Sequence, residues 1–140
     1  DYPQYTSSNL KETLKEADII SFHCKPKPDG SPIINAEEIN LMKNTALIIN
    51  TARGNLVSES ALFNALKANK IRGAALDVFS KEPLDKKNPL FDLKNVLLSP
   101  HISGNFQGYQ LNVINAFEKN LELFINNKSL KNRICKKRLY

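Results

Sequence analysis

Four titratable or charged side chains stand just after apolar runs of the sequence, where they could act together. They are a cation, two acids and a histidine: Arg53, Asp77, Glu82 and His101. A histidine titrates near neutral pH and can move a proton, and an arginine can bind an anionic group. When such residues converge at one edge of a fold, they form a constellation typical of a catalytic site. The chain must therefore contain elements that bring these separated segments together.

Short apolar runs precede these residues, and each is typical of a buried strand. The runs are rich in Ile, Leu, Val and Ala and span only a few residues. Continuous runs of this kind indicate strands buried on both faces of a parallel sheet and joined by right-handed crossovers. The predicted strands cover residues 18–23, 45–50, 71–78 and 95–99.

Helical patterns alternate with these strands. Asn35 and Ser58 are suited to cap two of the helices, because their side chains can accept a hydrogen bond from the first turn. The alternation predicts an α/β domain whose parallel strands end at one edge, where ligands bind in such sheets. The predicted helices cover residues 10–17, 35–42, 58–69 and about 104–126, with loops over residues 25–32 and 83–89.

Four short segments follow one another at the predicted strand ends. They are residues 50–54 (NTARG), 75–79 (ALDVF), 82–84 (EPL) and 100–104 (PHISG). Their order and spacing resemble the D-isomer-specific 2-hydroxyacid dehydrogenases, a family that includes phosphoglycerate, glycerate and D-lactate dehydrogenases. The resemblance covers nearly the whole chain. It implies a Rossmann-like fold and reversible hydride transfer between NAD and a 2-hydroxy or 2-oxo acid, with NADP less favoured.

The resemblance also implies roles for three catalytic residues. Arg53 would bind the substrate carboxylate, because a guanidinium offers two parallel donors to two oxygens. His101 would be the general acid–base, giving a proton to the ketone oxygen or taking one from the alcohol. Glu82 would pair with His101, where a carboxylate favours the imidazolium and fixes its tautomer. Taken alone, Arg53 would more simply be a side chain in a surface turn, Glu82 an exposed acid of a loop, and His101 a histidine packed at a strand end.

Further residues match family positions that bind the cofactor. Asp77 would meet its nicotinamide end, and Asp1, followed by Pro3, would accept hydrogen bonds from the adenosine ribose and favour NAD over NADP. Arg53 and His101 belong to this cofactor-binding set as well as to the catalytic one. The other members of the set are His23, Cys24, Thr51, Ala52 and Gly104.

The sequence departs from the family pattern at two places. No G-x-G-x-x-G loop precedes the first helix, although such a loop holds the cofactor pyrophosphate. Most of the substrate domain is also expected to lie outside these residues, so we expect the fold to be incomplete and the fragment alone to be inactive. Residues 25–29 (KPKPD) replace a Pro-Leu-Thr-rich stretch of the family, and Lys27 is given no cofactor role. We expect residues 1–104 to be the second part of an NAD-binding domain, 105–127 a helix returning towards the substrate domain, and 128–140 a basic tail.

The composition excludes several other classes. Of the 140 residues, 41% are hydrophobic and 24% charged, which is ordinary for a globular domain, and no apolar run is long enough for a membrane span. The two cysteines, Cys24 and Cys135, have no paired spacing, so neither a disulfide framework nor a metal site is expected. We therefore expect a cytoplasmic protein, which would be a homodimer as in the family.

Two alternatives concern binding rather than catalysis. The net charge of +6 resides in residues 128–140, which carry basic side chains and no acid. Such a tail can bind nucleic acid, but a solvated terminus is the simpler interpretation, and no nucleic-acid partner is expected. The other alternative is a nicotinamide-sensing corepressor on the same fold, a branch of the family that can retain Arg53, Glu82 and His101.

Overall fold

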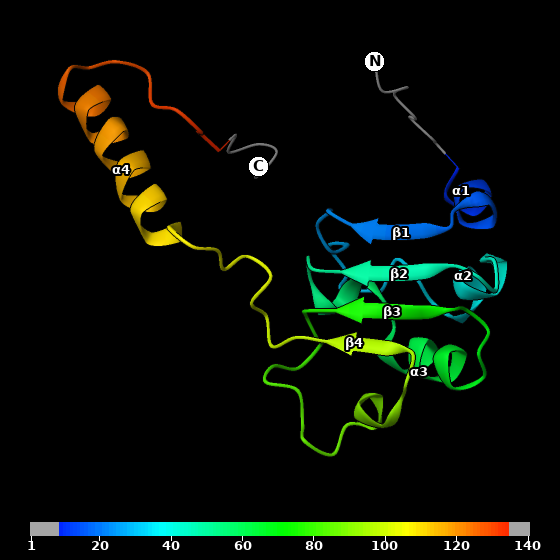
Figure 1. The fold of residues 1–140 in the computed structure, drawn as a ribbon. Helices are drawn as coiled ribbons and strands as arrows, with labels where there is room; N and C mark the ends of the chain where they lie inside the picture. Colours follow the sequence, from blue (N-terminus) through cyan, green and yellow to red (C-terminus); the bar gives the residue numbers. More distant parts are fainter. Residues whose placement is uncertain (1–8, 135–140) are drawn as a thin grey trace. The chain divides into compact units, whose positions relative to one another are not determined.

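The computed structural model describes residues 9–134 and contains a parallel sheet followed by a long helix (Figure 1). The chain divides into two compact units, Asp1–Ser103 and Gly104–Tyr140. The first holds a 4-stranded sheet in the order β1-β2-β3-β4, with all neighbouring strands parallel. The strands are β1 (Ile19–Phe22), β2 (Leu47–Asn50), β3 (Gly73–Leu76) and β4 (Val96–Leu98). The predicted α/β, Rossmann-like class is therefore confirmed.

Local sequence signals explain where the helices of the first unit begin. Asn9 accepts a hydrogen bond from the Lys11 backbone at the start of α1 (Leu10–Glu16). Asn35 and Glu38 form a capping box at the start of α2 (Ala36–Leu41), and the Ser58 hydroxyl accepts from the Ala61 backbone at the start of α3 (Glu59–Lys67). These side chains satisfy backbone N–H groups that have no partner inside the helix. The two predicted caps, Asn35 and Ser58, are both present.

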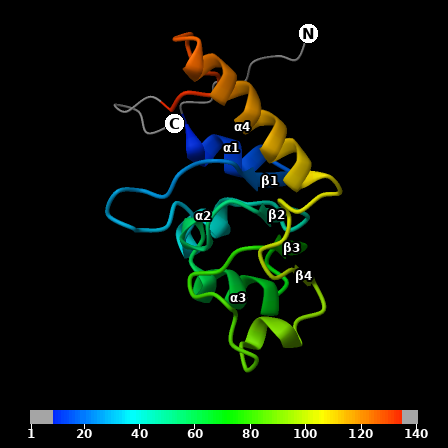
Figure 2. The ribbon, with the colours of Figure 1, turned by 90° about the vertical axis from the view of Figure 1, so that its left-hand side faces the viewer.

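The core lies on one face of the sheet, between the strands and the helices. Ile48 on β2 is fully buried, as are Leu62 and Leu66 on α3. Figures 1 and 2 show α2 and α3 on the same side of the sheet. Since the strand order is sequential, every right-handed crossover passes over the same face, and the described helices of this unit gather there.

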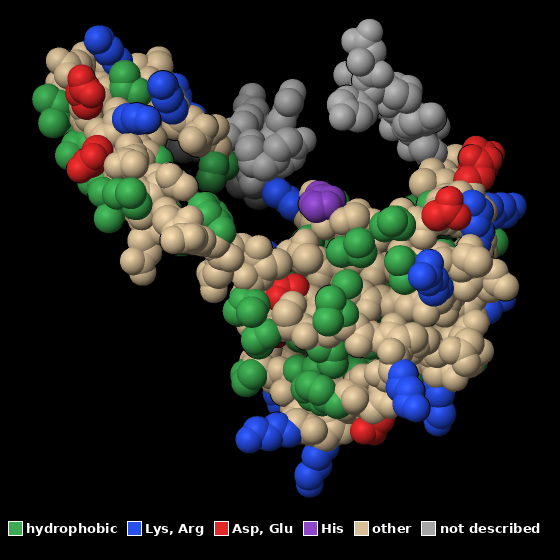
Figure 3. Space-filling view, in the orientation of Figure 1, with side chains coloured by type: hydrophobic (Ala, Val, Ile, Leu, Met, Phe, Trp, Pro, Cys, Tyr) green, Lys and Arg blue, Asp and Glu red, His purple; other side chains and the backbone are tan. Residues whose placement is uncertain are grey.

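Within the described residues of the first unit, no element covers the other face of the sheet, so the prediction of strands buried on both faces is wrong for this unit. Ile19 is 58% exposed and Leu97 is 71% exposed. Figure 3 shows hydrophobic side chains gathered over the sheet on the face turned towards the viewer. A continuous apolar run indicates that both faces are suited to burial, but it does not say which element covers each face.

Two 3₁₀ helices occur where the sequence predicts none, η1 (Gly54–Leu56) and η2 (Pro89–Asp92). The second follows the predicted polar loop and begins at a capping residue, Asn88, whose side chain accepts from the Leu90 backbone. In a unit this short, proline at the first position favours the turn without a long apolar pattern.

The second unit contains α4 (Tyr109–Ile125), which begins later than the predicted start near Gly104. Gly108 precedes the helix with a left-handed φ of 85°, a conformation that interrupts a right-handed helix. Its apolar side chains include Leu111, Ile114, Phe117 and Phe124, each at least 53% exposed. In the part of the chain that the structure describes, no helix has the length and apolar character that a membrane span requires.

Candidate active site

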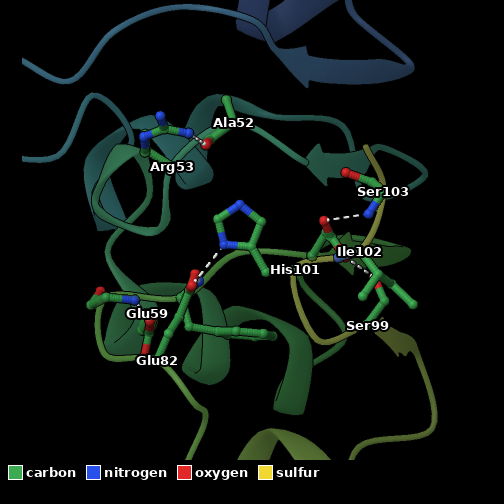
Figure 4. A network of polar contacts seen from close by, with 11 residues as sticks. Ala52, Arg53, Glu59, Glu82, Ser99, His101, Ile102 and Ser103 are labelled. Carbon is green, nitrogen blue, oxygen red and sulfur yellow. Dashed lines mark hydrogen bonds and ion pairs between the residues drawn. The ribbon is translucent and has the colours of Figure 1, made fainter. Parts of the chain in front are cut away.

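The carboxyl ends of the strands bring the polar segments to one edge of the sheet. Asn50 ends β2 and is followed by Arg53; Asp77 follows β3 directly, and His101 follows β4. Adjacent strands lie about 4.8 Å apart, so the ends of β2 and β4 are roughly 10 Å from each other. Figure 4 shows the His101 ring between the turn that carries Arg53 and the loop that carries Glu82.

His101 and Glu82 form the central contact of this edge. The imidazole Nδ1 lies 2.7 Å from Glu82 Oε2, and the other carboxylate oxygen accepts a hydrogen bond from the Phe79 backbone N–H at 2.9 Å. The bond at Nδ1 orients the ring and leaves Nε2 as the nitrogen for a ligand. The His101 hydrogen bond, followed by the Phe79 N–H, lowers the pKa of Glu82, so its carboxylate stays ionised beside the ring at neutral pH.

Asp77 holds the turn on which His101 is carried. Its Oδ1 accepts from the Ser99 hydroxyl at 2.5 Å and from the Ile102 N–H at 2.9 Å, while Oδ2 accepts from the Ser103 N–H at 2.9 Å. His101 itself has a left-handed φ of 54°, which costs a side chain other than glycine about 1–2 kcal/mol. The carboxylate thus anchors both sides of a strained position and keeps the imidazole turned towards Glu82.

Burial alone would raise the pKa of Asp77, but the hydrogen bonds from Ser99, Ser103 and Ile102 hold that pKa far below its ordinary value. A carboxyl group with a depressed pKa stabilises the fold fully above its unfolded pKa, and this contribution is lost as the pH falls towards the folded value. We therefore expect the free energy of unfolding to decrease as the pH is lowered from about 5.

The variant Asp77→Asn should be less stable at neutral pH and should lose less stability on acidification than the wild type. Urea unfolding between neutral and acidic pH measures both quantities. Parallel curves for the two proteins would show that the charged form of Asp77 contributes nothing specific to the fold.

Arg53 lies in a turn that Asn50 braces from inside. The Asn50 side chain, 2% exposed, donates to the Arg53 carbonyl at 2.9 Å and accepts from the Ala52 N–H at 3.2 Å. The Arg53 side chain is exposed, and its Nη1 donates to the Ala52 carbonyl at 2.6 Å. The other guanidinium N–H groups remain suited to an anion. The bracing role of Asn50 was not predicted, although an amide at the end of a buried strand is a signal for it.

The other predicted site residues occupy less decisive positions. His23 follows β1 at the far side of the sheet, where its Nε2 lies 2.8 Å from the Ser21 hydroxyl rather than near His101. Cys24, beside it, is an exposed free thiol. Thr51 is exposed at the end of β2, and a side chain at Gly104 would meet no atom within 4 Å. Asp1 lies outside the described residues.

An apolar cavity of about 350 Å³ lies beside the His101–Glu82 pair. Phe79, Leu84, Phe91 and Leu98 line it together with the pair itself. Arg53 is not among its lining residues, so the cavity does not form the place where an anion would meet the guanidinium.

Comparison with known proteins connects this arrangement to one family. The family model described as "D-isomer specific 2-hydroxyacid dehydrogenase, NAD binding domain" matches residues 1–103. The D-3-phosphoglycerate dehydrogenase of Methanocaldococcus jannaschii is 50% identical over 93 residues, which are 66% of this chain and 18% of that protein. The glyoxylate reductase of Aeropyrum pernix is 38% identical over 120 residues, 86% of this chain and 36% of that protein.

The structure is similar to one of a D-isomer specific 2-hydroxyacid dehydrogenase from Xanthobacter autotrophicus Py2, which was solved in complex with NADPH and MES. The TM-score is 0.80 at 30% identity, and the match covers 94% of this chain and 53% of that chain. The 140 residues therefore span about half of this solved chain and a smaller share of the two curated relatives.

Proposed function

This chain belongs to the D-isomer-specific 2-hydroxyacid dehydrogenase family, and from that membership we propose that the protein interconverts a D-2-hydroxy acid and a 2-oxo acid. The observation that supports the proposal most strongly is the 2.7 Å contact between His101 Nδ1 and Glu82 Oε2, at the same sheet edge as Arg53. A nicotinamide cofactor, when bound, supplies the hydride that adds to the carbonyl carbon of the 2-oxo acid.

The residues of this chain supply the proton and the orientation. As the carbonyl oxygen gains negative charge, His101 Nε2 donates a proton to it, and the product is the 2-hydroxy acid. In the reverse direction the neutral imidazole accepts that proton from the hydroxyl group. Glu82 keeps Nδ1 occupied, so that Nε2 faces the substrate. Arg53 binds the substrate carboxylate through two charge-assisted hydrogen bonds and thereby orients the neighbouring carbonyl.

The described residues fit part of a dinucleotide site. The turn at Thr51 and Ala52 lies at the carboxyl end of a central strand, where ligands bind in such sheets. Asp77 accepts from the Ser99 hydroxyl and from the Ile102 and Ser103 N–H groups, so it would hold the turn that meets the nicotinamide end of the cofactor. His23 and Cys24, after β1, would lie further along the cofactor, and Asp1 would favour NAD over NADP.

A phosphate-binding glycine loop is absent from the printed sequence, so we propose that these 140 residues alone bind NADH weakly and turn over no substrate. Calorimetric titration of the chain with NADH tests the first part, and micromolar binding would refute it.

The reaction itself is tested with the complete gene product that contains these residues. Assays of reduced cofactor consumption, with glyoxylate and other 2-oxo acids as substrates, should show turnover with NADH in preference to NADPH. In the reverse direction only the D-enantiomers of 2-hydroxy acids should be oxidised. Absence of turnover with every such acid and with both cofactors would refute the proposed function.

We further propose a cytoplasmic homodimer. The exposed thiol of Cys24 suits a reducing compartment, and the exposed apolar side chains of α4 suit burial against another protein surface. Sedimentation of the complete gene product gives its mass in solution, and a monomer at micromolar concentration would contradict the dimer.

A further inference from the structure

The peptide that joins Phe79 to Ser80 is held from three directions. The Phe79 N–H donates to Glu82 Oε1 at 2.9 Å, and the Ser80 N–H donates to Glu59 Oε1 at the start of α3. On the third side, a Cβ at Gly54 would overlap the Phe79 carbonyl and the Ser80 nitrogen. Glycine is therefore required there by close backbone approach, in the residue next to Arg53.

These contacts tie together two segments that carry separate parts of the site. Arg53, Gly54 and Glu59 belong to the segment that follows β2, while Ser80 and Glu82 belong to the loop that follows β3. We propose that Glu59 is a positioning residue: by accepting the Ser80 N–H, its carboxylate fixes the loop that carries Glu82 and so maintains the contact between Glu82 and His101. The importance of this role for catalysis rests on the proposed function, whereas the contact itself does not.

The physical reason is that Glu82 and Ser80 are exposed at the surface, where water competes for their hydrogen bonds. Without the Glu59 carboxylate, the Ser80 N–H would bond to water and the loop over residues 79–82 would lose its link to α3. The Glu82 carboxylate would then spend less time at Nδ1 of His101. The Glu59 oxygen is the acceptor that links this loop to α3, and it acts together with the Glu82 contact and the close approach of Gly54.

A simpler role for Glu59 is that an acid in the first turn stabilises a helix through its dipole. Glu37, in the first turn of α2, provides the matched control, because Glu37→Ala removes an acid from the same kind of position away from the loop. The variant Glu59→Gln separates the two roles in another way, since it removes the charge but retains an oxygen that can accept from the Ser80 N–H.

The test follows the 140-residue chain by NMR, without substrate or cofactor. Titration of the Glu82 side-chain carboxyl carbon reports its pKa, and amide hydrogen exchange reports the protection of Ser80 and Phe79. In Glu59→Ala we expect the pKa of Glu82 to rise towards its ordinary value, because the His101 and Phe79 hydrogen bonds that lower it are weakened. We also expect the Ser80 amide to exchange roughly tenfold faster. Glu59→Gln should resemble the wild type, and Glu37→Ala should leave both quantities unchanged.

The proposal is overturned if folded Glu59→Ala has the Glu82 titration of the wild type, or if Glu37→Ala shifts it equally. If Glu59→Ala does not fold, hydrogen exchange of the wild type still tests the proposal. A Ser80 amide that is unprotected in the wild type would overturn it. None of these measurements involves a reaction, so failure of the proposed dehydrogenase activity would leave the result standing, and the reverse also holds.

Discussion

Replacement of His101 by alanine should lower the turnover of 2-oxo acid reduction by roughly 10²–10⁴-fold, the usual contribution of a positioned general acid. The carbonyl oxygen would then have to take its proton from water. Affinity for NADH should change little, since the substitution removes the proton donor and leaves the turn at Thr51 and Ala52 intact. Steady-state rates and NADH titration of the complete gene product measure the two effects separately.

His23→Ala is the matched control, because His23 is the other histidine of the sequence and lies at the end of β1. It should retain far more turnover than His101→Ala. If NADH affinity falls as steeply as turnover in His101→Ala, while the rate per bound enzyme is kept, the acid–base role is misassigned.

Arg53→Gln should lower kcat/KM for the 2-oxo acid by roughly a hundredfold, which corresponds to about 3 kcal/mol. Glutamine keeps polar hydrogen-bonding groups but cannot offer two parallel charged donors to a carboxylate. The loss should be largest for substrates with a carboxylate and small for a neutral ketone of the same size. Comparing kcat/KM for such a pair of substrates measures the carboxylate-specific part.

Arg72→Gln controls for the loss of a positive charge. Arg72 directly precedes β3, at the opposite end of the strand from Asp77, and is exposed. Its replacement should leave the selectivity for carboxylates unchanged. An Arg53 variant that loses activity equally towards charged and neutral ketones would indicate a role in shaping the turn rather than in binding the carboxylate.

The edge of the sheet at which Arg53, Glu82 and His101 lie could be predicted, because it follows from short segments of the sequence. Each apolar run ends in polar residues, and parallel strands place their carboxyl ends on the same side. The positions of Arg53, Glu82 and His101 after successive strands therefore predicted that they lie at one edge of the sheet. The structure places Glu82 and His101, which are 19 residues apart in the sequence, in direct contact. The cap at Ser58 and the capping box at Asn35 were likewise readable from short-range chemistry.

Other features depend on which segments meet in space, and the sequence carries little signal for them. The partners of Asp77 are one such feature, because its oxygens accept from Ser99, Ile102 and Ser103, which lie 22 to 26 residues further along the chain. The Glu59 contact with Ser80 spans 21 residues and looks, in the sequence, like an ordinary acid at a helix start. The exposed face of the sheet was also not predicted, because an apolar strand has the same residue pattern whether or not another element covers it.

A double-mutant cycle between Glu82 and His101 tests the central claim most directly, because that claim is that Glu82 acts through the imidazole. In the complete gene product, Glu82→Gln alone should lower kcat by roughly tenfold, while the same substitution in His101→Ala should change it by less than about twofold. This result would show that the two side chains work as one unit. If the two losses instead multiply, Glu82 contributes independently of His101, and the catalytic pair described above is contradicted.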